Sequence, residues 1–227
     1  MTSDPRRLRL RAAPGAWDLG GDPLAWDWRS LPSLSPFQKS DGSAASDHPT
    51  EVRLCANAHA LFARFDCSDR DIWGTFRERD DPVYSEEAVE IFIAPGAARP
   101  REYFEFEVSP MGVLFDARVR NPDSRRETME VDVAWDCPGI RWNARIDEPG
   151  HHWAAALVIP WRSLVDSRAP LPRLWRANLF RIERPHDGPA EFSCWIPTLA
   201  TPPDFHKPEC FGEWQLADQP PAAAAKE

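Results

Sequence analysis

The sequence predicts an all-β protein: an antiparallel two-sheet β-sandwich, jelly-roll-like, with about nine or ten strands and one short helix. From Glu51 onward, short segments alternate apolar and polar residues and are separated by turn formers. The chain has 24 Pro among 227 residues, and each Pro removes an N–H donor, which disfavours long helices. No helical pattern alternates with the strands, so two antiparallel sheets are favoured over a parallel α/β sheet.

The first expected strands form a hairpin within residues 51–69, with a turn near Asn57. A polar, acidic loop over residues 68–86 follows, and function often lies in such loops. The next strand is AVEIFIAP, which ends at a Pro-Gly turn. The segment YFEFEVSP (residues 103–110) then alternates aromatic and aliphatic residues with polar ones, so we expect one buried and one wetted face.

The remaining strands are expected in the segments GVLFDARVR, IRWNARID, HWAAALVIPW, RANLFRIER and FGEWQL. Only IPWRSLVD (residues 159–166) is typical of a short helix, because its Pro suits a first helical turn. We interpret residues 1–24 as an N-terminal lead-in and residues 25–217 as a single domain that opens with a strand near residues 25–28. Residues 218–227 are expected to be a disordered tail.

Charge and composition exclude several classes of function. With 27 basic and 36 acidic residues the net charge is −9, and no basic run offers the footprint that nucleic acid requires. No window is apolar enough for a membrane span. No signal peptide is evident, which indicates a cytoplasmic protein, or a secreted or periplasmic one if the start site is misassigned. The five cysteines lack C-x-x-C spacing and the six histidines are scattered, so we expect reduced thiols and no zinc.

Acidic residues concentrate in and around the loop at residues 68–86. Three interpretations remain open for them: solvated loop charges, a calcium site built from hard oxygen ligands, or a carboxylate pair that hydrolyses a glycosidic bond. The series comprises Asp66, Asp69, Asp71, Asp80, Asp81, Glu86, Glu87 and Glu90.

Several aromatic residues lie in or beside loops instead of at alternating strand positions, among them Trp73, Tyr84, Trp195 and Phe205. Flat rings beside polar groups suit a sugar, whose C–H faces stack on them, although core packing is the alternative for each ring. No G-x-S-x-G nucleophile motif and no Gly-rich phosphate loop is present. We therefore assign no catalytic residue.

A series of strings resembles carbohydrate-binding module family 9, a DOMON-like carbohydrate-binding β-sandwich. In chain order these strings are RFDCSD, EEAVEIFIAP, YFEFEVSP, GVLFD, IPWRSL, RANLFRIE, WIPT and FHKPECFGEWQL. The resemblance covers roughly residues 25–216. It implies a jelly-roll-like sandwich that binds sugars without cleaving them and that often accompanies glycoside hydrolases. It also implies that most of the 11 Trp mark the architecture of the family.

The resemblance also implies site residues. Tyr84 and Phe205 match the two positions whose rings sandwich the sugar, and Glu90 matches the glutamate that accepts hydrogen bonds from sugar hydroxyls. Arg141 falls where a basic donor is expected. The family stacking positions usually hold Trp, so both rings here are smaller.

Two polar positions of the family differ in this chain. Phe180 and Glu107 stand where a polar donor and a basic donor are expected, so the ligand is expected to differ from the usual glucose- or xylose-based chains, or the site to be vestigial. The resemblance implies no obligatory cofactor. The carboxylates for a structural calcium ion would be Asp66, Asp69 and Asp81.

The leading hypothesis is a non-catalytic protein that binds a mono- or oligosaccharide and acts in carbohydrate catabolism or beside glycoside hydrolases. A sandwich scaffold or protein-interaction module that has lost sugar binding is the second hypothesis. A glycoside hydrolase that uses the acidic loop is the third. The sequence indicates neither a nucleic-acid nor a membrane partner and specifies no oligomeric state.

Overall fold

The computed structural model describes residues 4–15, 17, 20–147, 149–166 and 168–217. The strands are β1 Arg7–Ala12, β2 Ser33–Leu34, β3 Gln38–Lys39, β4 Thr50–Ala56, β5 Ala60–Ser68, β6 Ala88–Pro95, β7 Glu102–Val108, β8 Leu114–Arg120, β9 Glu130–Asp132, β10 Arg141–Asp147, β11 His152–Pro160, β12 Leu174–Glu183, β13 Glu191–Cys194 and β14 Gly212–Leu216. The 3-10 helices are η1 Pro23–Ala25, η2 Trp28–Ser30, η3 Val83–Ser85, η4 Arg126–Thr128, η5 Trp161–Ser163 and η6 Pro208–Cys210. The tail expected over residues 218–227 lies outside the described part of the chain.

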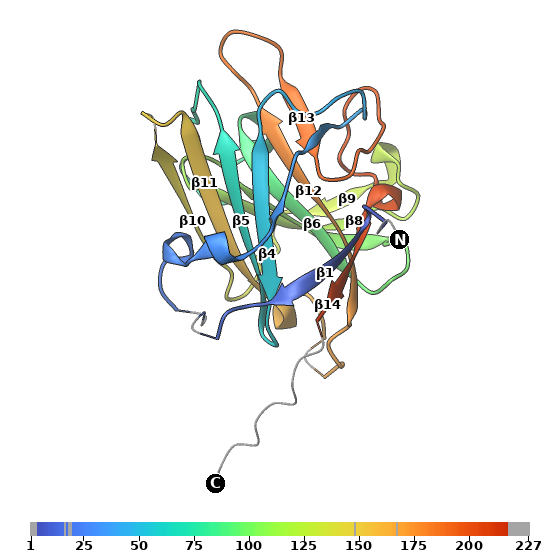
Figure 1. Ribbon diagram of the computed structural model, residues 1–227. Coiled ribbons are helices and arrows are strands. Elements are labelled where there is room, and N and C mark those ends of the chain that lie inside the picture. Colours follow the sequence, from blue (N-terminus) through green and yellow to red (C-terminus); the bar gives the residue numbers. More distant parts are fainter. Residues whose placement is uncertain (1–3, 16, 18–19, 148, 167, 218–227) are drawn as a thin grey trace.

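The strands form one curled, mixed sheet whose two halves face each other (Figure 1). Along the sheet the order is β10-β11-β5-β4-β1-β14-β12-β6-β7-β8-β9. Strand β1 joins the halves, because its first four residues pair in parallel with β14 and its last two pair in parallel with β4. All other pairings are antiparallel among the described strands.

The all-β class is confirmed, but the expectation of nine or ten strands in two separate antiparallel sheets is wrong. The described residues contain 14 strands. Four of them have only two to four residues, too few for an alternating pattern to be visible. Strand β1 falls inside the segment interpreted as a lead-in, and its parallel pairing depends on partners more than 40 residues away.

Two local expectations also need correction. Residues 25–28 are not a strand, because Asp22 and Asp27 accept hydrogen bonds from Leu24 N and Arg29 N and start the 3-10 turns η1 and η2. The short helix expected over residues 159–166 is reduced to η5, a single 3-10 turn.

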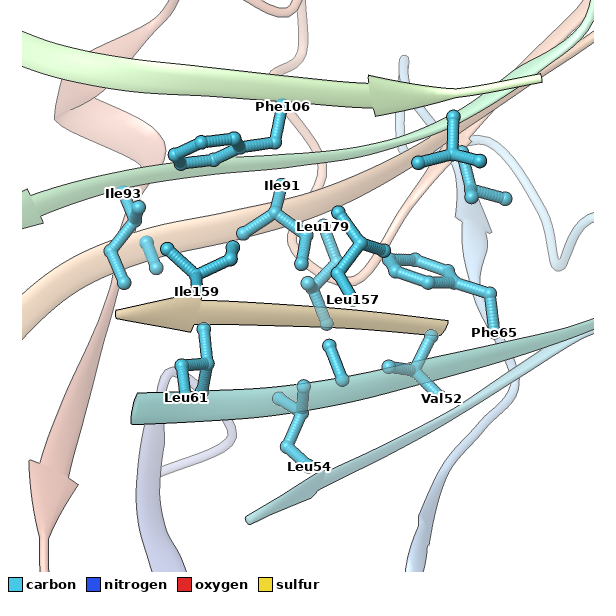
Figure 2. Packing of buried hydrophobic residues seen from close by; sticks show 14 of the residues in the cluster. Val52, Leu54, Leu61, Phe65, Ile91, Ile93, Phe106, Leu157, Ile159 and Leu179 are labelled. Atoms are coloured by element: carbon cyan, nitrogen blue, oxygen red, sulfur yellow. The ribbon is translucent and has the colours of Figure 1, made fainter. Parts of the chain in front are cut away.

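The main core fills the space between the two halves of the sheet. Figure 2 shows Ile91, Ile93, Phe106 and Leu179 from β6, β7 and β12 facing the residues of β4, β5 and β11. Four tryptophans are fully buried (Trp153, Trp161, Trp175 and Trp214), so these rings are architectural. All five cysteines are free thiols, as expected. None of the described helices is long and apolar enough to cross a membrane.

The half formed by β12, β6, β7 and β8 has a second apolar face, pointing away from the main core. Side chains alternate between the two faces of a strand, so Ile91 enters the core while Glu90 and Phe92 point outward. Phe205 and Phe211, from the segment between β13 and β14, pack on this outer face together with Phe92, Tyr103 and Phe180. The outer face therefore has a small core of its own, and the pocket described below opens beside it.

We expect the bridging strand β1 to be required for stability. Leu10 is 1% exposed and belongs to the main core, so Leu10→Ala should lower the free energy of unfolding by about 2–5 kcal/mol. Arg11→Ala, an exposed neighbour on the same strand, should change it by less than about 0.5 kcal/mol. Urea denaturation of both variants measures the difference, and equal effects would contradict a bridging role for β1.

Candidate functional site

A cavity of about 450 Å³ opens on the outer face of β6, β7, β8 and β12. Three of the four residues expected at the site, Tyr84, Glu90 and Phe205, line it together. They come from η3, from β6 and from the segment between β13 and β14. The other residues that line the cavity are Phe92, Glu105, Glu107, Phe115, Arg126, Met129, Val131, Val133, Ile182, Arg184, Phe192, Pro203 and His206.

Tyr84 forms the accessible aromatic wall. It lies in η3, which is anchored by the buried Val83, and its ring meets Phe115 edge-on at 5.4 Å between centroids. The side chain is still 47% exposed, so ring surface remains for a ligand. Burial of its hydroxyl, together with the nearby Glu107 and Glu105, raises the pKa of Tyr84.

Phe205 is a less accessible wall. Only 6% of it is exposed, because one ring face stacks on Phe180 at 4.3 Å and 18° and Phe192 meets it edge-on at 5.8 Å. Phe180, expected from the sequence to be a lost hydrogen-bond donor, is thus the support that orients Phe205.

Polar contacts fasten the segment that carries Phe205. Arg126 contacts Asp204 at 2.8 Å, and Asn121 Nδ2 donates to the carbonyl oxygen of His206 at 3.1 Å. The hydroxyl of Tyr103 lies 2.7 Å from Nδ1 of His206. Burial lowers the pKa of His206 to about 3, so this imidazole is neutral at ordinary pH.

Three glutamates, Glu90, Glu105 and Glu107, form the acidic floor of the pocket. Glu90 lies directly opposite Glu107 in the β6–β7 register and opposite Phe180 in the β6–β12 register. Glu105 is two residues before Glu107 on the same face of β7. Like charges at directly opposed positions destabilise a sheet, so this arrangement stores an electrostatic cost at the floor.

The acidic floor is almost completely buried: Glu90 is 2% exposed, Glu105 4% and Glu107 1%. Burial raises the pKa of Glu105 to about 7. It raises the pKa values of Glu90 and Glu107 well above the ordinary range, with repulsion from the neighbouring glutamates as the second cause. The backbone N–H of Tyr84 opposes the shift at Glu107.

Arg141 does not line this pocket. It lies in β10, at the far end of the strand order from β7 and β8, and its positive charge helps to lower the pKa of Asp22. Alternation along β10 turns Trp142 towards the main core, so Arg141 faces outward on the opposite half of the sheet. The basic residues of the pocket are instead Arg126 and Arg184.

The residues that the sequence did not suggest fall into two groups. Glu105 could have been found, because it shares the alternation of Glu107 in FEFEV. Arg126 and Phe192 could not, because they lie in η4 and in the short strand β13, where no periodic pattern indicates which way a side chain points.

The carboxylates suggested for structural calcium, Asp66, Asp69 and Asp81, do not gather at one point. Asp66 contacts Arg53 at 3.0 Å and Arg64 at 2.7 Å. Asp81 accepts from the backbone N–H groups of Arg77 and Glu78. Asp69 belongs to a second buried cluster with Glu87 and Glu183.

In that second cluster an arginine supplies the positive charge. The buried Arg181 contacts Asp69 at 3.3 Å and also pairs with Glu183. Burial raises the pKa of Glu183 to about 7 despite Arg181. Burial and repulsion from Glu183 and Asp69 raise the pKa of Glu87 to about 9, and neither carboxylate oxygen of Glu87 has a hydrogen-bond partner.

Comparison with known proteins identifies the architecture. The family model described as carbohydrate-binding family 9 matches residues 43–216. A protein of Arthroderma benhamiae named "Extracellular protein" is 29% identical over 160 residues, which are 67% of each chain.

Three solved structures, of two proteins, share the fold. A protein from Bacteroides uniformis, described as carbohydrate-binding, superposes with a TM-score of 0.72 at 15% identity and covers 93% of this chain and 99% of its own. A family 9 module from Caldicellulosiruptor kristjanssonii in complex with glucose gives 0.61 at 13% identity over 96% and 99% of the two chains. Its complex with cellotriose gives the same score and identity over 97% and 98%.

The raised pKa of Glu87 leads to a pH-dependent prediction. A carboxyl whose pKa is about 9 when folded and ordinary when unfolded favours folding most below pH 4.5, and this contribution is lost as pH rises towards 9. Glu87→Gln should therefore have the same free energy of unfolding as the parent near pH 4.5. At pH 8 its free energy of unfolding should be higher than that of the parent by more than about 1 kcal/mol, the equivalent of one pKa unit.

Urea denaturation of parent and variant at the two pH values measures this difference. The exposed Glu78→Gln serves as the control and should show no such pH dependence. A Glu87→Gln variant that is equally stable or less stable at pH 8 would contradict the assignment.

Proposed function

Because the chain belongs to carbohydrate-binding family 9, we propose that it binds a mono- or oligosaccharide in the pocket lined by Tyr84, Glu90 and Phe205, without cleaving it. The single observation that carries the proposal is the convergence of these three residues, from three separate segments, on one open cavity. The volume of about 450 Å³ lies within the usual range for small-molecule sites.

Each wall of the pocket offers a group that a sugar ring requires. Tyr84 supplies an exposed ring for stacking on C–H faces, and Glu90 at the floor supplies a hydrogen-bond acceptor for hydroxyls. Arg126 and Arg184 at the rim supply the donors that the family resemblance assigned to Arg141. Phe205 forms another wall of the pocket, with its orientation supported by Phe180.

The ligand should differ in detail from those of the structural relatives, which were solved with glucose and cellotriose. A floor with Glu107 in place of a basic residue offers acceptors where a donor was expected. A buried polar site discriminates strongly against ligands that leave its groups unpaired. We therefore propose a sugar that presents several hydroxyl donors to the floor.

Two features support binding without catalysis. The glutamates of the floor have oxygens within 4.8 Å of one another, and both oxygens of Glu107 are closed off from solvent. Glycoside hydrolysis needs two carboxylates with the scissile bond, and in inverting enzymes also a water, between them. The oxygens of the floor are closer together than the roughly 5–9.5 Å that separates the two carboxyl groups of a glycosidase.

One observation favours a second function, a protein-interaction module that has lost sugar binding. Phe205 is only 6% exposed. Of the two rings expected to sandwich the sugar, Tyr84 alone is therefore well exposed. The N-terminal segment does not line the pocket, however, and the acidic floor would be an unusual centre for a protein interface, from which charged residues are generally depleted.

The proposal is tested by isothermal titration with glucose, xylose, cello-oligosaccharides and a wider panel of sugars at millimolar concentration. We expect heat with at least one sugar, and Tyr84→Ala should weaken that binding by about tenfold, the loss of one stacked ring. Tyr84→Phe should keep most of the affinity, because it preserves the ring.

Leu199→Ala is the matched control, since Leu199 is an exposed apolar side chain that does not line the pocket. It should leave affinity unchanged. The absence of heat with every sugar would favour the interaction module. Binding that is unaffected by Tyr84→Ala would remove this pocket from consideration.

A further inference from the structure

The acidic floor has the geometry of a cation site. One oxygen from each of Glu90, Glu105 and Glu107 lies within 4.8 Å of the others. Oxygens that share one calcium ion at 2.3–2.6 Å lie no more than about 4.6–5.2 Å apart, so the three carboxylates are close enough together to contact one ion. Regular β6–β7 pairing, not a flexible loop, holds these oxygens in place.

The carboxylates of the floor lack the partners that buried carboxylates usually have. Both oxygens of Glu107 and Oε1 of Glu90 are buried without a hydrogen bond. Among the described residues, no Arg or Lys lies within ion-pair distance of the three glutamates. The nearest basic group of a side chain is the neutral His206, whose Nε2 lies 3.8 Å from Glu105. Burying a polar group without a hydrogen-bond or ionic partner is costly, so a partner is expected.

The two other acidic clusters differ from the floor of the pocket, because each contains an arginine. Arg181 pairs with Asp69 and Glu183, which form the second cluster together with Glu87. Asp80, Asp116 and Asp136 surround Arg79, which contacts Asp116 and Asp136 at 2.6 and 2.7 Å. Of the three acidic clusters within the described ranges, only the floor of the pocket lacks an internal arginine.

We propose that Glu90, Glu105 and Glu107 bind a calcium ion at the floor of the pocket and that this ion coordinates hydroxyls of the bound sugar. Carboxylate-only ligands select hard cations such as Ca²⁺ over zinc or copper, which prefer nitrogen or sulfur. The coordination of sugar hydroxyls by the ion rests on the proposed sugar function. The ion site itself does not.

The arrangement leaves coordination positions for the sugar. Calcium takes 6–8 oxygen ligands, and three carboxylates supply three to six of them according to whether each binds through one oxygen or two. Glu90, Glu105 and Glu107 all line the cavity, so water or two neighbouring sugar hydroxyls from the cavity can complete the shell. A basic residue was expected at the position of Glu107, so the floor lacks that positive charge. The bound ion would supply it.

Calcium titration of the intact, chelator-treated protein tests the ion site. We expect saturable binding with one ion per chain and a rise in melting temperature on adding CaCl₂. Glu107→Gln, which keeps shape and removes charge, should weaken binding at least tenfold, and Glu90→Gln should do the same. Glu102→Gln, an exposed glutamate on the same strand with a side chain 51% exposed, should leave it unchanged.

A sugar titration of the parent protein, once with CaCl₂ and once with EDTA, tests whether the ion takes part in sugar binding. The expected result is sugar binding that is lost in EDTA. Equal sugar binding in both conditions overturns the role of the ion while leaving the proposed function intact. Calcium binding that depends on Glu107, with no sugar bound in either condition, overturns the proposed function but supports the ion site.

Two outcomes overturn the ion site. One is the absence of any calcium effect on the parent protein. The other is calcium binding that survives both Glu107→Gln and Glu90→Gln, because the ion would then lie elsewhere. Circular dichroism of each variant confirms that the comparison is between folded proteins.

Discussion

The pocket of this protein depends on the antiparallel register between β6 and β7. Because side chains alternate strictly between the faces of a strand, a register that sends Ile91 and Phe106 into the main core must send Glu90 and Glu107 to the opposite face. A shift by one residue would bury the glutamates between the sheets and expose the isoleucine. The packing of the main core therefore fixes the position of the acidic floor.

The loops that close the outer face convert this floor into a pocket. Asp204 and His206 are fastened by Arg126, Asn121 and Tyr103, and the fastened segment lays Phe205 on Phe180. Phe180, which stands where the family resemblance implied a polar donor, thus supports a wall of the pocket. The pocket combines a rigid apolar wall, an exposed ring at Tyr84 and a buried acidic floor, and it is this combination that a sugar-binding function and a cation would use together.

Much of the fold was predictable because its longer strands carry period-two patterns that report burial directly. The hairpin of β4 and β5 and the strands β6, β7, β11 and β12 all follow such patterns. That Tyr84, Glu90 and Phe205 line one pocket was predictable, because family resemblance aligned them with motifs next to regular strands. Arg141 was misplaced relative to this pocket because a strand pattern says which residues share a face but not where β10 stands in the sheet order.

By itself the sequence determined the all-β class, the in-and-out pattern of each long strand, the absence of a catalytic nucleophile motif and the family resemblance, because these depend on local spacing and residue chemistry. Only the tertiary structure decided that β1 joins the two halves into one curled sheet, that Phe205 rests on Phe180, and that Glu90, Glu105 and Glu107 meet at one point without an arginine among them. These features arise from pairings between distant segments. No local pattern encodes which segments will meet, since that choice is made by the packing of the whole chain.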